Sequence, residues 1–246
     1  METPLIFLLA LFVVAALYAS VGHGGASGYL ALMALFGLST LTMKSSALTL
    51  NLFVSAISFY AYYRQGYFRF KILWPFILGS IPLAFVGARL HIDPTVYKVI
   101  LGIFLAIAVA RMVFQPKART EAVTRFQFLP AIAIGAFLGL FSGMIGIGGG
   151  IILSPVLLLL GWANVKETAA VSAIFIFLNS TAGLAGLYTT GIHIDTEIVF
   201  WIGAALSGGL VGAHLGAAKL SFTGLRYLLA MVLLLASFKL IIPSFF

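Results

Sequence analysis

Two long stretches without a formal charge constrain this chain more than any other feature. No Lys, Arg, Asp or Glu occurs from Thr3 to Met43, a run of 41 residues, or from Phe126 to Val165, a run of 40 residues. One membrane-spanning helix needs about 20 mostly apolar residues, so each stretch has room for two. Of the 246 residues, 62% are hydrophobic and only 8% are charged, against roughly 25% charged in soluble domains. The sequence therefore predicts an integral membrane protein, because its polar side chains are too few to cover a soluble surface.

The remaining charges divide the chain into ten apolar segments, five in each half. Two lie in 3–43 and two in 126–165, and the other six are 45–63, 72–88, 95–114, 168–190, 198–218 and 222–242. We therefore expect an all-α membrane protein of about ten segments. The first segment lacks the basic start of a signal peptide, so we expect it to be retained as a span. The expected organisation is a first transmembrane repeat over 1–114, a cytoplasmic linker over 115–127 and a second transmembrane repeat over 128–246.

Glycine clusters interrupt both long stretches at matching positions. The first cluster is Gly22-His23-Gly24-Gly25, and the second is Gly146-Ile147-Gly148-Gly149-Gly150, 124 residues further along the chain. Gly87 and Gly212 match at an offset of 125 residues. This pattern predicts a duplication, and five crossings in each half would invert the second copy. That topology places ten Lys and Arg residues on one side and four on the other, so the positive-inside rule puts both termini outside the cytoplasm.

The glycine clusters form the predicted binding site. Paired, glycine-interrupted segments at equivalent positions of two halves indicate the substrate site of a transporter. Glycine ends a helix and leaves backbone N–H groups free, and the positive end of the next helix dipole favours an anion. In a continuous helix each glycine would cost roughly 1 kcal/mol relative to alanine, which argues against a purely packing role for the clusters. A packing role is expected for the isolated glycines, namely Gly79, Gly87, Gly203, Gly208, Gly209 and Gly212.

The second cluster belongs to a longer motif. The chain contains a segment that resembles the signature of the TauE/SafE family of sulfite exporters, also called TSUP: Phe141-Ser142-Gly143-Met144-Ile145-Gly146-Ile147-Gly148-Gly149-Gly150, followed by Ser154-Pro155-Val156-Leu157. The first cluster occupies the position of that family's first-half copy, and the resemblance covers essentially the whole chain. It implies a secondary carrier in the prokaryotic inner membrane for a small sulfur-containing anion such as sulfite, a sulfonate or thiosulfate. His23 departs from the second copy, which has Ile147.

Polar side chains near the clusters complete the candidate site. Hydroxyl and amide groups can hydrogen-bond an oxyanion without the cost of a buried charge. The unperturbed pKa of histidine lies near neutrality, so His23 could carry a coupling proton or meet the anion, and a structural hydrogen bond to the backbone is an equally supported alternative. The candidate substrate-binding residues are Gly22, His23, Gly24, Gly25, Ser27, Asn51, Ser142, Gly146, Gly148, Gly149, Gly150 and Asn179.

Other functions have weaker support in the sequence. A small-anion channel is the alternative, because broken helices that meet inside a membrane would serve a channel as well as a carrier. An enzyme is disfavoured because all six acidic residues fall in predicted loops or at segment ends, and no catalytic residue, cofactor or metal site is predicted. The chain has no cysteine, which removes thiolate metal sites, and its scattered basic residues do not resemble a nucleic-acid surface. The expected partners are the anionic substrate, the lipid bilayer and a coupling proton or ion, and a homo-oligomer stays open.

Overall fold

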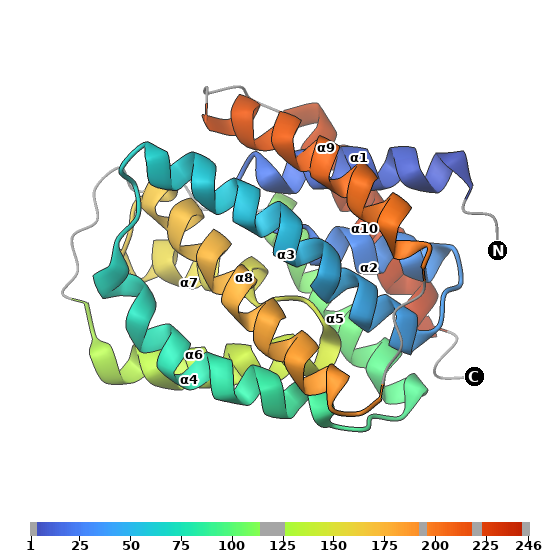
Figure 1. The fold of residues 1–246 in the computed structure, drawn as a ribbon, viewed down its shortest axis with the longest axis horizontal. Coiled ribbons are helices and arrows are strands. Elements are labelled where there is room, and N and C mark those ends of the chain that lie inside the picture. Colours follow the sequence, from blue (N-terminus) through green and yellow to red (C-terminus); the bar gives the residue numbers. More distant parts are fainter. Residues whose placement is uncertain (1–3, 114–125, 192–195, 218–222, 243–246) are drawn as a thin grey trace.

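Helices account for all regular structure in the described chain (Figure 1). The computed structural model describes residues 4–113, 126–191, 196–217 and 223–242, which form ten helices and no strand. In chain order these are α1 Leu5–Ala19, α2 Ala26–Leu35, α3 Thr40–Arg64, α4 Phe70–Arg89, α5 Pro94–Val113, α6 Phe128–Ile145, α7 Gly150–Leu159, α8 Val165–Tyr188, α9 Ile198–Ala217 and α10 Thr223–Ile241. The predicted all-helical fold is confirmed for this part of the chain. Most of the expected linker over 115–127 lies outside the described residues.

Helix length separates the ten elements into two kinds. Helices α4, α6, α8 and α9 are long and apolar enough to cross a membrane. In contrast, α2 and α7 have only 10 residues each, which corresponds to about 15 Å, or half of a hydrocarbon core of about 30 Å. The number of helices agrees with the expected ten segments. The expectation of two full spans in each long charge-free stretch is not met, because each stretch holds one longer helix and one short helix that starts at a glycine break.

Glycine allows two pairs of helices to pack closely. In α4, a Cβ atom at Gly79 would lie 2.5 Å from the carbonyl oxygen of Ile132 in α6. In α9, Gly212 approaches the carbonyl oxygen of Ala16 in α1 in the same way. Backbones come this close only where the residue at the contact is small. The predicted packing role is confirmed for Gly79, Gly87, Gly208, Gly209 and Gly212, whereas a Cβ atom at Gly203 would meet nothing within 4 Å.

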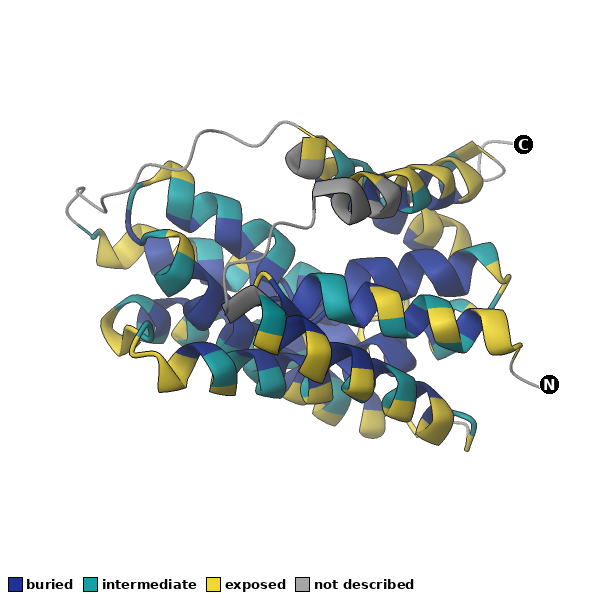
Figure 2. Ribbon diagram, turned by 90° about the horizontal axis from the view of Figure 1, so that it is seen from above, coloured by how far each residue is buried: buried dark blue, intermediate teal, exposed yellow. Residues whose placement is uncertain are grey.

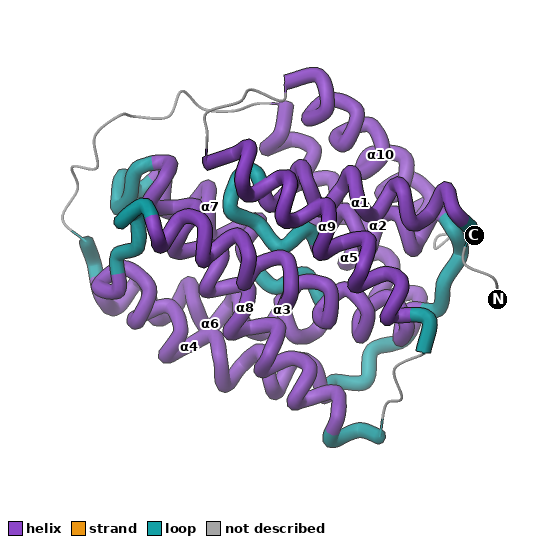
Figure 3. Tube along the Cα trace, turned by 45° about the horizontal axis from the view of Figure 1, so that its top comes forward, coloured by secondary structure: helices purple, strands orange, loops and turns teal. Residues whose placement is uncertain are grey.

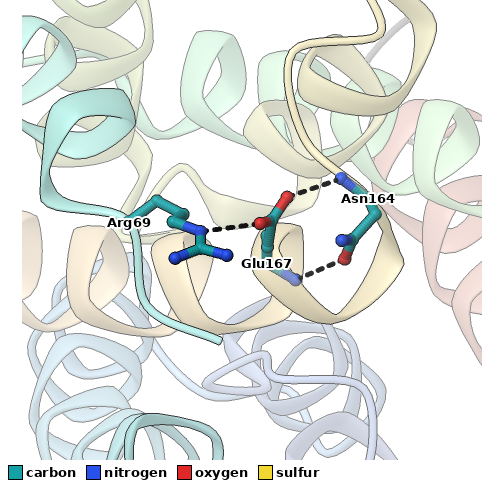
Figure 4. Close-up of polar contacts among 3 residues, drawn as sticks. All are labelled: Arg69, Asn164 and Glu167. Atoms are coloured by element: carbon teal, nitrogen blue, oxygen red, sulfur yellow. Dashed lines mark hydrogen bonds and ion pairs between the residues drawn. The ribbon is translucent and has the colours of Figure 1, made fainter. Parts of the chain in front are cut away.

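Helices α3 and α8 lie side by side through the middle of the molecule (Figures 1 and 3). Helix α8 also packs on α4, and α3 packs on α9, so this pair connects the α4–α6 side to the α1–α9 side. Side-chain caps fix where both helices begin. The Ser39 hydroxyl accepts a hydrogen bond from the Thr42 amide at 3.2 Å before α3, and Asn164 and Glu167 form a capping box at the start of α8 (Figure 4).

Exposed residues lie on the outer faces of the helices and buried residues lie in the interior (Figure 2), and many of the exposed side chains are large and apolar. Leu129 and Phe200, for example, are 76% and 67% exposed. Such an exterior is suited to lipid, which solvates apolar side chains as well as the protein interior does. Trp162 and Trp201 fall near segment ends, so the sequence predicts interfacial aromatics. The structure corrects this prediction, because both are buried within the protein, at 7% and 6% exposure.

Candidate functional site

Both glycine breaks approach the side chain of Asn51, which lies near the middle of α3. A Cβ atom added at Gly148 would lie 2.6 Å from Asn51 Nδ2, and one added at Gly24 would clash with Asn51 Oδ1. Ile176 of α8 contacts both breaks. Its Cγ2 atom lies 2.9 Å from the Cβ position of Gly24 and 3.0 Å from that of Gly148. The two breaks therefore meet where α3 and α8 pack together.

Positive backbone φ angles explain why glycine occupies the breaks. Gly25 precedes α2 with φ of 97°, and Gly149 precedes α7 with φ of 76°. These values lie in the left-handed region, which glycine adopts without steric cost. Within the described residues, no hydrogen bond uses the backbone N–H groups of Gly24, Gly25, Gly148 and Gly149. The breaks thus present free main-chain donors beside the positive ends of two short helices.

Asn51 is fully buried but only partly satisfied. Its Nδ2 atom donates to the Ile147 carbonyl at 3.4 Å and to the Ser180 hydroxyl at 3.3 Å. Its Oδ1 atom has no hydrogen-bond partner among the described residues. An unsatisfied buried group costs about 1–3 kcal/mol. Because a flip of the amide exchanges its oxygen and nitrogen, this buried group can act either as an acceptor or as a donor.

His23 connects the first break to helices of the second half. Its Nε2 atom lies 2.9 Å from the Ser154 hydroxyl of α7, which in turn lies 2.8 Å from the Ser172 hydroxyl of α8. Its Nδ1 atom lies 3.1 Å from the Val21 carbonyl oxygen. A neutral imidazole fits this arrangement when Nδ1–H donates to the carbonyl and Nε2 accepts from Ser154. The hydrogen bond to the backbone that the structural alternative predicts for His23 is therefore present. A role of His23 in proton coupling stays a prediction.

Three further predicted side chains differ in their surroundings. The Ser142 hydroxyl is buried without a partner in the described structure, and Ser142 Cβ lies 3.5 Å from the Cβ position of Gly149. Ser27 instead shares a hydrogen bond of 2.5 Å with the Tyr18 hydroxyl, between α1 and α2. Asn179 donates at 2.8 Å to a carbonyl of its own helix. Ser142 thus lies beside the second break, whereas the hydrogen bonds of Ser27 and Asn179 are made elsewhere.

The outermost glycine of each break packs on the N-terminal part of α3 or α8, away from Asn51 and Ile176. Gly22 packs on Ala169 of α8, and Gly146 packs on Lys44 of α3, with its Cβ position 3.1 Å from the lysine Cα. The glycines that pack around Asn51 and Ile176 are Gly24, Gly148 and Gly150. The predicted set therefore divides into a central group and two outer turns.

Sequence reasoning missed a basic cavity beside the second break. This cavity has a volume of about 470 Å³, and its lining includes Lys44, Arg89, His91 and Tyr97. Cations beside apolar segments commonly act as topology signals or interface anchors, so the charge pattern does not single out Lys44 or Arg89 as binding residues. One sequence difference could have drawn attention to Lys44: the residue at the matching position of the second half, 125 residues later, is Ala169. A cation therefore occupies this position in the first half only.

The fold, its apolar exterior and the comparisons with known proteins define a multi-pass membrane transporter. The chain belongs to the family described as sulfite exporter TauE/SafE, whose profile matches residues 7–240. It is 36% identical to the probable membrane transporter protein y4hK of Sinorhizobium fredii, over 98% of this chain and 100% of that protein. It is 26% identical to the probable membrane transporter protein YunE of Bacillus subtilis, over 92% and 93% of the two chains. No solved structure matches the chain significantly.

Proposed function

We propose that the protein is a secondary transporter that moves a small sulfur-containing anion, of the sulfite, sulfonate or thiosulfate class, by alternating access. One observation carries this proposal: both glycine breaks meet at Asn51 and Ile176, so main-chain N–H groups from the starts of two short helices converge. Such donors bind an anion through hydrogen bonds and the helix dipole, without a buried cation. The family description as a sulfite exporter supports a sulfur oxyanion as the solute.

Reciprocal contacts support an inverted duplication as the basis of the site. Gly22 in the first half packs on Ala169 in the second, and Gly146 in the second half packs on Lys44 in the first. The two glycines are 124 residues apart in the chain, and their two partners are 125 residues apart. Each half therefore holds the break of the other half in an equivalent way, as expected when two related repeats face one another.

The helix pairs outside the site support the same symmetry. Gly87 of α4 packs on the carbonyl oxygen of Leu140 in α6, and Gly212 of α9 packs on that of Ala16 in α1. Gly87 and Gly212 differ by 125 residues, and Ala16 and Leu140 by 124. The fourth helix of each half thus packs on the first helix of the other half. Movement of one half relative to the other would have to change these two helix contacts.

The two ends of α3 differ in access, which favours a carrier over a channel. Near its start, the cavity reaches Lys44, beside the outer turn of the second break. Near its end, Tyr62 lies in a buried apolar cluster with Ala169 and donates a hydrogen bond of 2.8 Å to the carbonyl oxygen of Ser20. A cavity that approaches the site at one end of α3, with a closed cluster at the other end, fits an end state of alternating access. A conducting channel needs a path on both sides.

The proposed membrane is the prokaryotic inner membrane, with both termini outside the cytoplasm. In that orientation the cavity near Lys44 faces away from the cytoplasm. The closed side then carries the ion pair between Arg69 and Glu167, with 2.7 Å between Nε and Oε1 (Figure 4). This assignment rests on the excess of basic residues on the side proposed to be cytoplasmic.

Flux measurements with the purified, reconstituted protein test the proposal. Proteoliposomes would be challenged separately with sulfite, thiosulfate, sulfate and short sulfonates. We expect saturable uptake and counterflow for at least one sulfur anion, with neither in protein-free liposomes. Anion current without saturation or counterflow would support the channel instead. Absence of flux for every sulfur anion, in protein that remains folded, would contradict the proposed substrate class.

A further inference from the structure

The basic cavity becomes more enclosed toward the second glycine break. Arg89 and His91 are exposed at its mouth. Lys44 and Tyr97, which also line it, are only 6% and 4% exposed. None of the described residues that line the cavity is acidic. A small anion that entered would therefore meet positive charge at the mouth and again at the buried end.

Lys44 has no counter-ion in the described structure. Its Nζ atom donates to the carbonyl oxygen of Ala88 at 2.9 Å, near the C-terminal end of α4. The negative end of that helix offsets part of the lysine charge. An ammonium group has three donors, so further N–H bonds remain available on the cavity side. Burial of a cation without an anion is costly, and a bound oxyanion would supply the missing partner.

The buried end of the cavity adjoins the proposed transport site. The Cα atom of Lys44 lies 3.1 Å from the Cβ position of Gly146, the outer glycine of the second break. The Tyr97 hydroxyl donates at 2.8 Å to the carbonyl oxygen of Ile145, one residue earlier in the chain. Met144 completes the connection because it lines the cavity itself. An anion held by Lys44 would therefore lie beside the segment that carries the free N–H groups.

We propose that this cavity is a second anion-binding site, in which Lys44 binds the transported oxyanion on its way to or from the glycine breaks. Arg89 raises the local concentration of anions at the mouth. The site exists on one side only, because Ala169 occupies the matching position in the second half. This inference rests on the proposed transport function. A purely structural lysine that caps α4 would instead affect folding without changing anion affinity.

The lack of cysteine in the chain allows a direct test of the charge. Lys44→Cys would introduce the sole thiol, which 2-bromoethylamine converts into a lysine analogue and iodoacetate converts into a carboxylate. Both products are thioethers, which sulfite does not cleave. We expect Lys44→Cys to weaken sulfite and thiosulfate binding at least about tenfold, as measured by calorimetry on the purified protein. Aminoethylation should restore the affinity, and carboxymethylation should lower it further.

Lys98→Cys is the matched control, since Lys98 is an exposed cation of α5 that does not line the cavity. Its modification should leave anion binding unchanged. Affinity that is independent of the charge at position 44 would overturn the cavity site while leaving the transport function intact. Failure of the wild-type protein to bind or move any sulfur oxyanion would instead refute the proposed function. If Lys44→Cys does not fold, Lys44→Gln and Lys44→Arg are compared, and wild-type affinity in Lys44→Gln would overturn the proposal.

Discussion

Asn51 of α3 and Gly148 of the second break are so close that a methyl group on the glycine would lie 2.6 Å from the asparagine Nδ2 atom. A methyl group on Gly24 would clash with Oδ1 of the same asparagine side chain. One side chain therefore lies between two segments that are far apart in the sequence. The packing leaves no room for a larger residue at either glycine unless Asn51 moves.

Gly148→Ala should abolish transport, and Gly148→Leu should do so without preventing membrane insertion. Gly66→Ala is the control, because both glycines have φ of 77° but a Cβ atom at Gly66 would meet nothing within 4 Å. Both variants pay a backbone penalty of about 1–2 kcal/mol. Only the change at Gly148 displaces Asn51. Flux normalised to the amount of folded protein measures the difference, and equal flux in the two variants would remove the role assigned to the break.

Asn51→Leu should impair transport more than folding. The substitution eliminates a buried oxygen without a partner, but it also removes the hydrogen bonds from Nδ2 to Ile147 and Ser180, so the free energy of unfolding should fall by about 1–3 kcal/mol. Transport should fall at least about tenfold, the effect of losing roughly 1.4 kcal/mol of substrate binding. Asn179→Leu is the comparison, because Asn179 is also fully buried with an Oδ1 atom that lacks a partner among the described residues, but its Nδ2 atom donates to its own helix. Retained transport in Asn51→Leu would contradict a binding role for this amide.

Ser154→Ala should destabilise the protein by about 1–2 kcal/mol, because it removes the hydroxyl between His23 and Ser172. Ser207→Ala serves as the control, since the Ser207 hydroxyl is exposed and bonds only to carbonyls of its own helix. Chemical unfolding in detergent compares the two. A loss of stability in Ser207→Ala as large as in Ser154→Ala would show that the contact between the halves is not stabilising.

Removal of either partner from the ion pair of Arg69 and Glu167 should have unequal effects. The Arg69 side chain is 58% exposed, so Arg69→Ala should change stability by about 0–1 kcal/mol. Glu167 also accepts a hydrogen bond from the backbone of Asn164 within the capping box (Figure 4). Glu167→Ala should therefore cost more, about 0.5–2 kcal/mol. Equal losses of stability in the two variants, measured by thermal unfolding, would show that Glu167 stabilises the protein through the ion pair and not through the capping box.

Asp93 should add an acid-dependent contribution to stability. The backbone N–H of Thr95 donates to Asp93 Oδ1 at 2.8 Å and lowers the pKa of this exposed carboxyl. The unfolded value is about 3.9, so the stabilisation is complete above that pH and is lost as the pH falls through the lower folded pKa. Asp93→Asn keeps a capping side chain but cannot titrate. Thermal unfolding between about pH 3 and pH 6 should show a smaller acid effect in this variant, and identical profiles would exclude the contribution.

Local signals explain what the sequence predicted well. Gaps between charges predicted an all-helical membrane protein, because the hydrocarbon core admits few charges. The clusters at Gly24 and Gly148 predicted where helices end, since glycine at these positions permits backbone turns that other residues resist. The motif around the second cluster also predicted the family correctly. Each of these features is encoded within a few neighbouring residues.

Features that depend on packing between distant segments escaped prediction. Trp201 is buried because Phe7 of α1 packs against it, with 5.0 Å between ring centroids. The residues near Trp201 in the sequence do not predict that contact. Lys44 is buried where Gly146 packs against it and its Nζ atom donates to the carbonyl oxygen of Ala88 in α4. Ser180 joins Asn51 across the α3–α8 contact. Periodicity and composition report which residues are apolar, but they do not specify which helices meet.

An experimental structure of the protein with selenite tests the central claim most directly, because selenite is a close chemical analogue of sulfite and selenium gives an anomalous signal. The account predicts an anomalous peak between the two breaks, with selenite oxygen atoms within hydrogen-bond distance of the backbone N–H groups of Gly24 or Gly148. A further peak near Lys44 would support the cavity site. Selenium bound only elsewhere on the folded protein, with both breaks still packed around Asn51, would contradict the account.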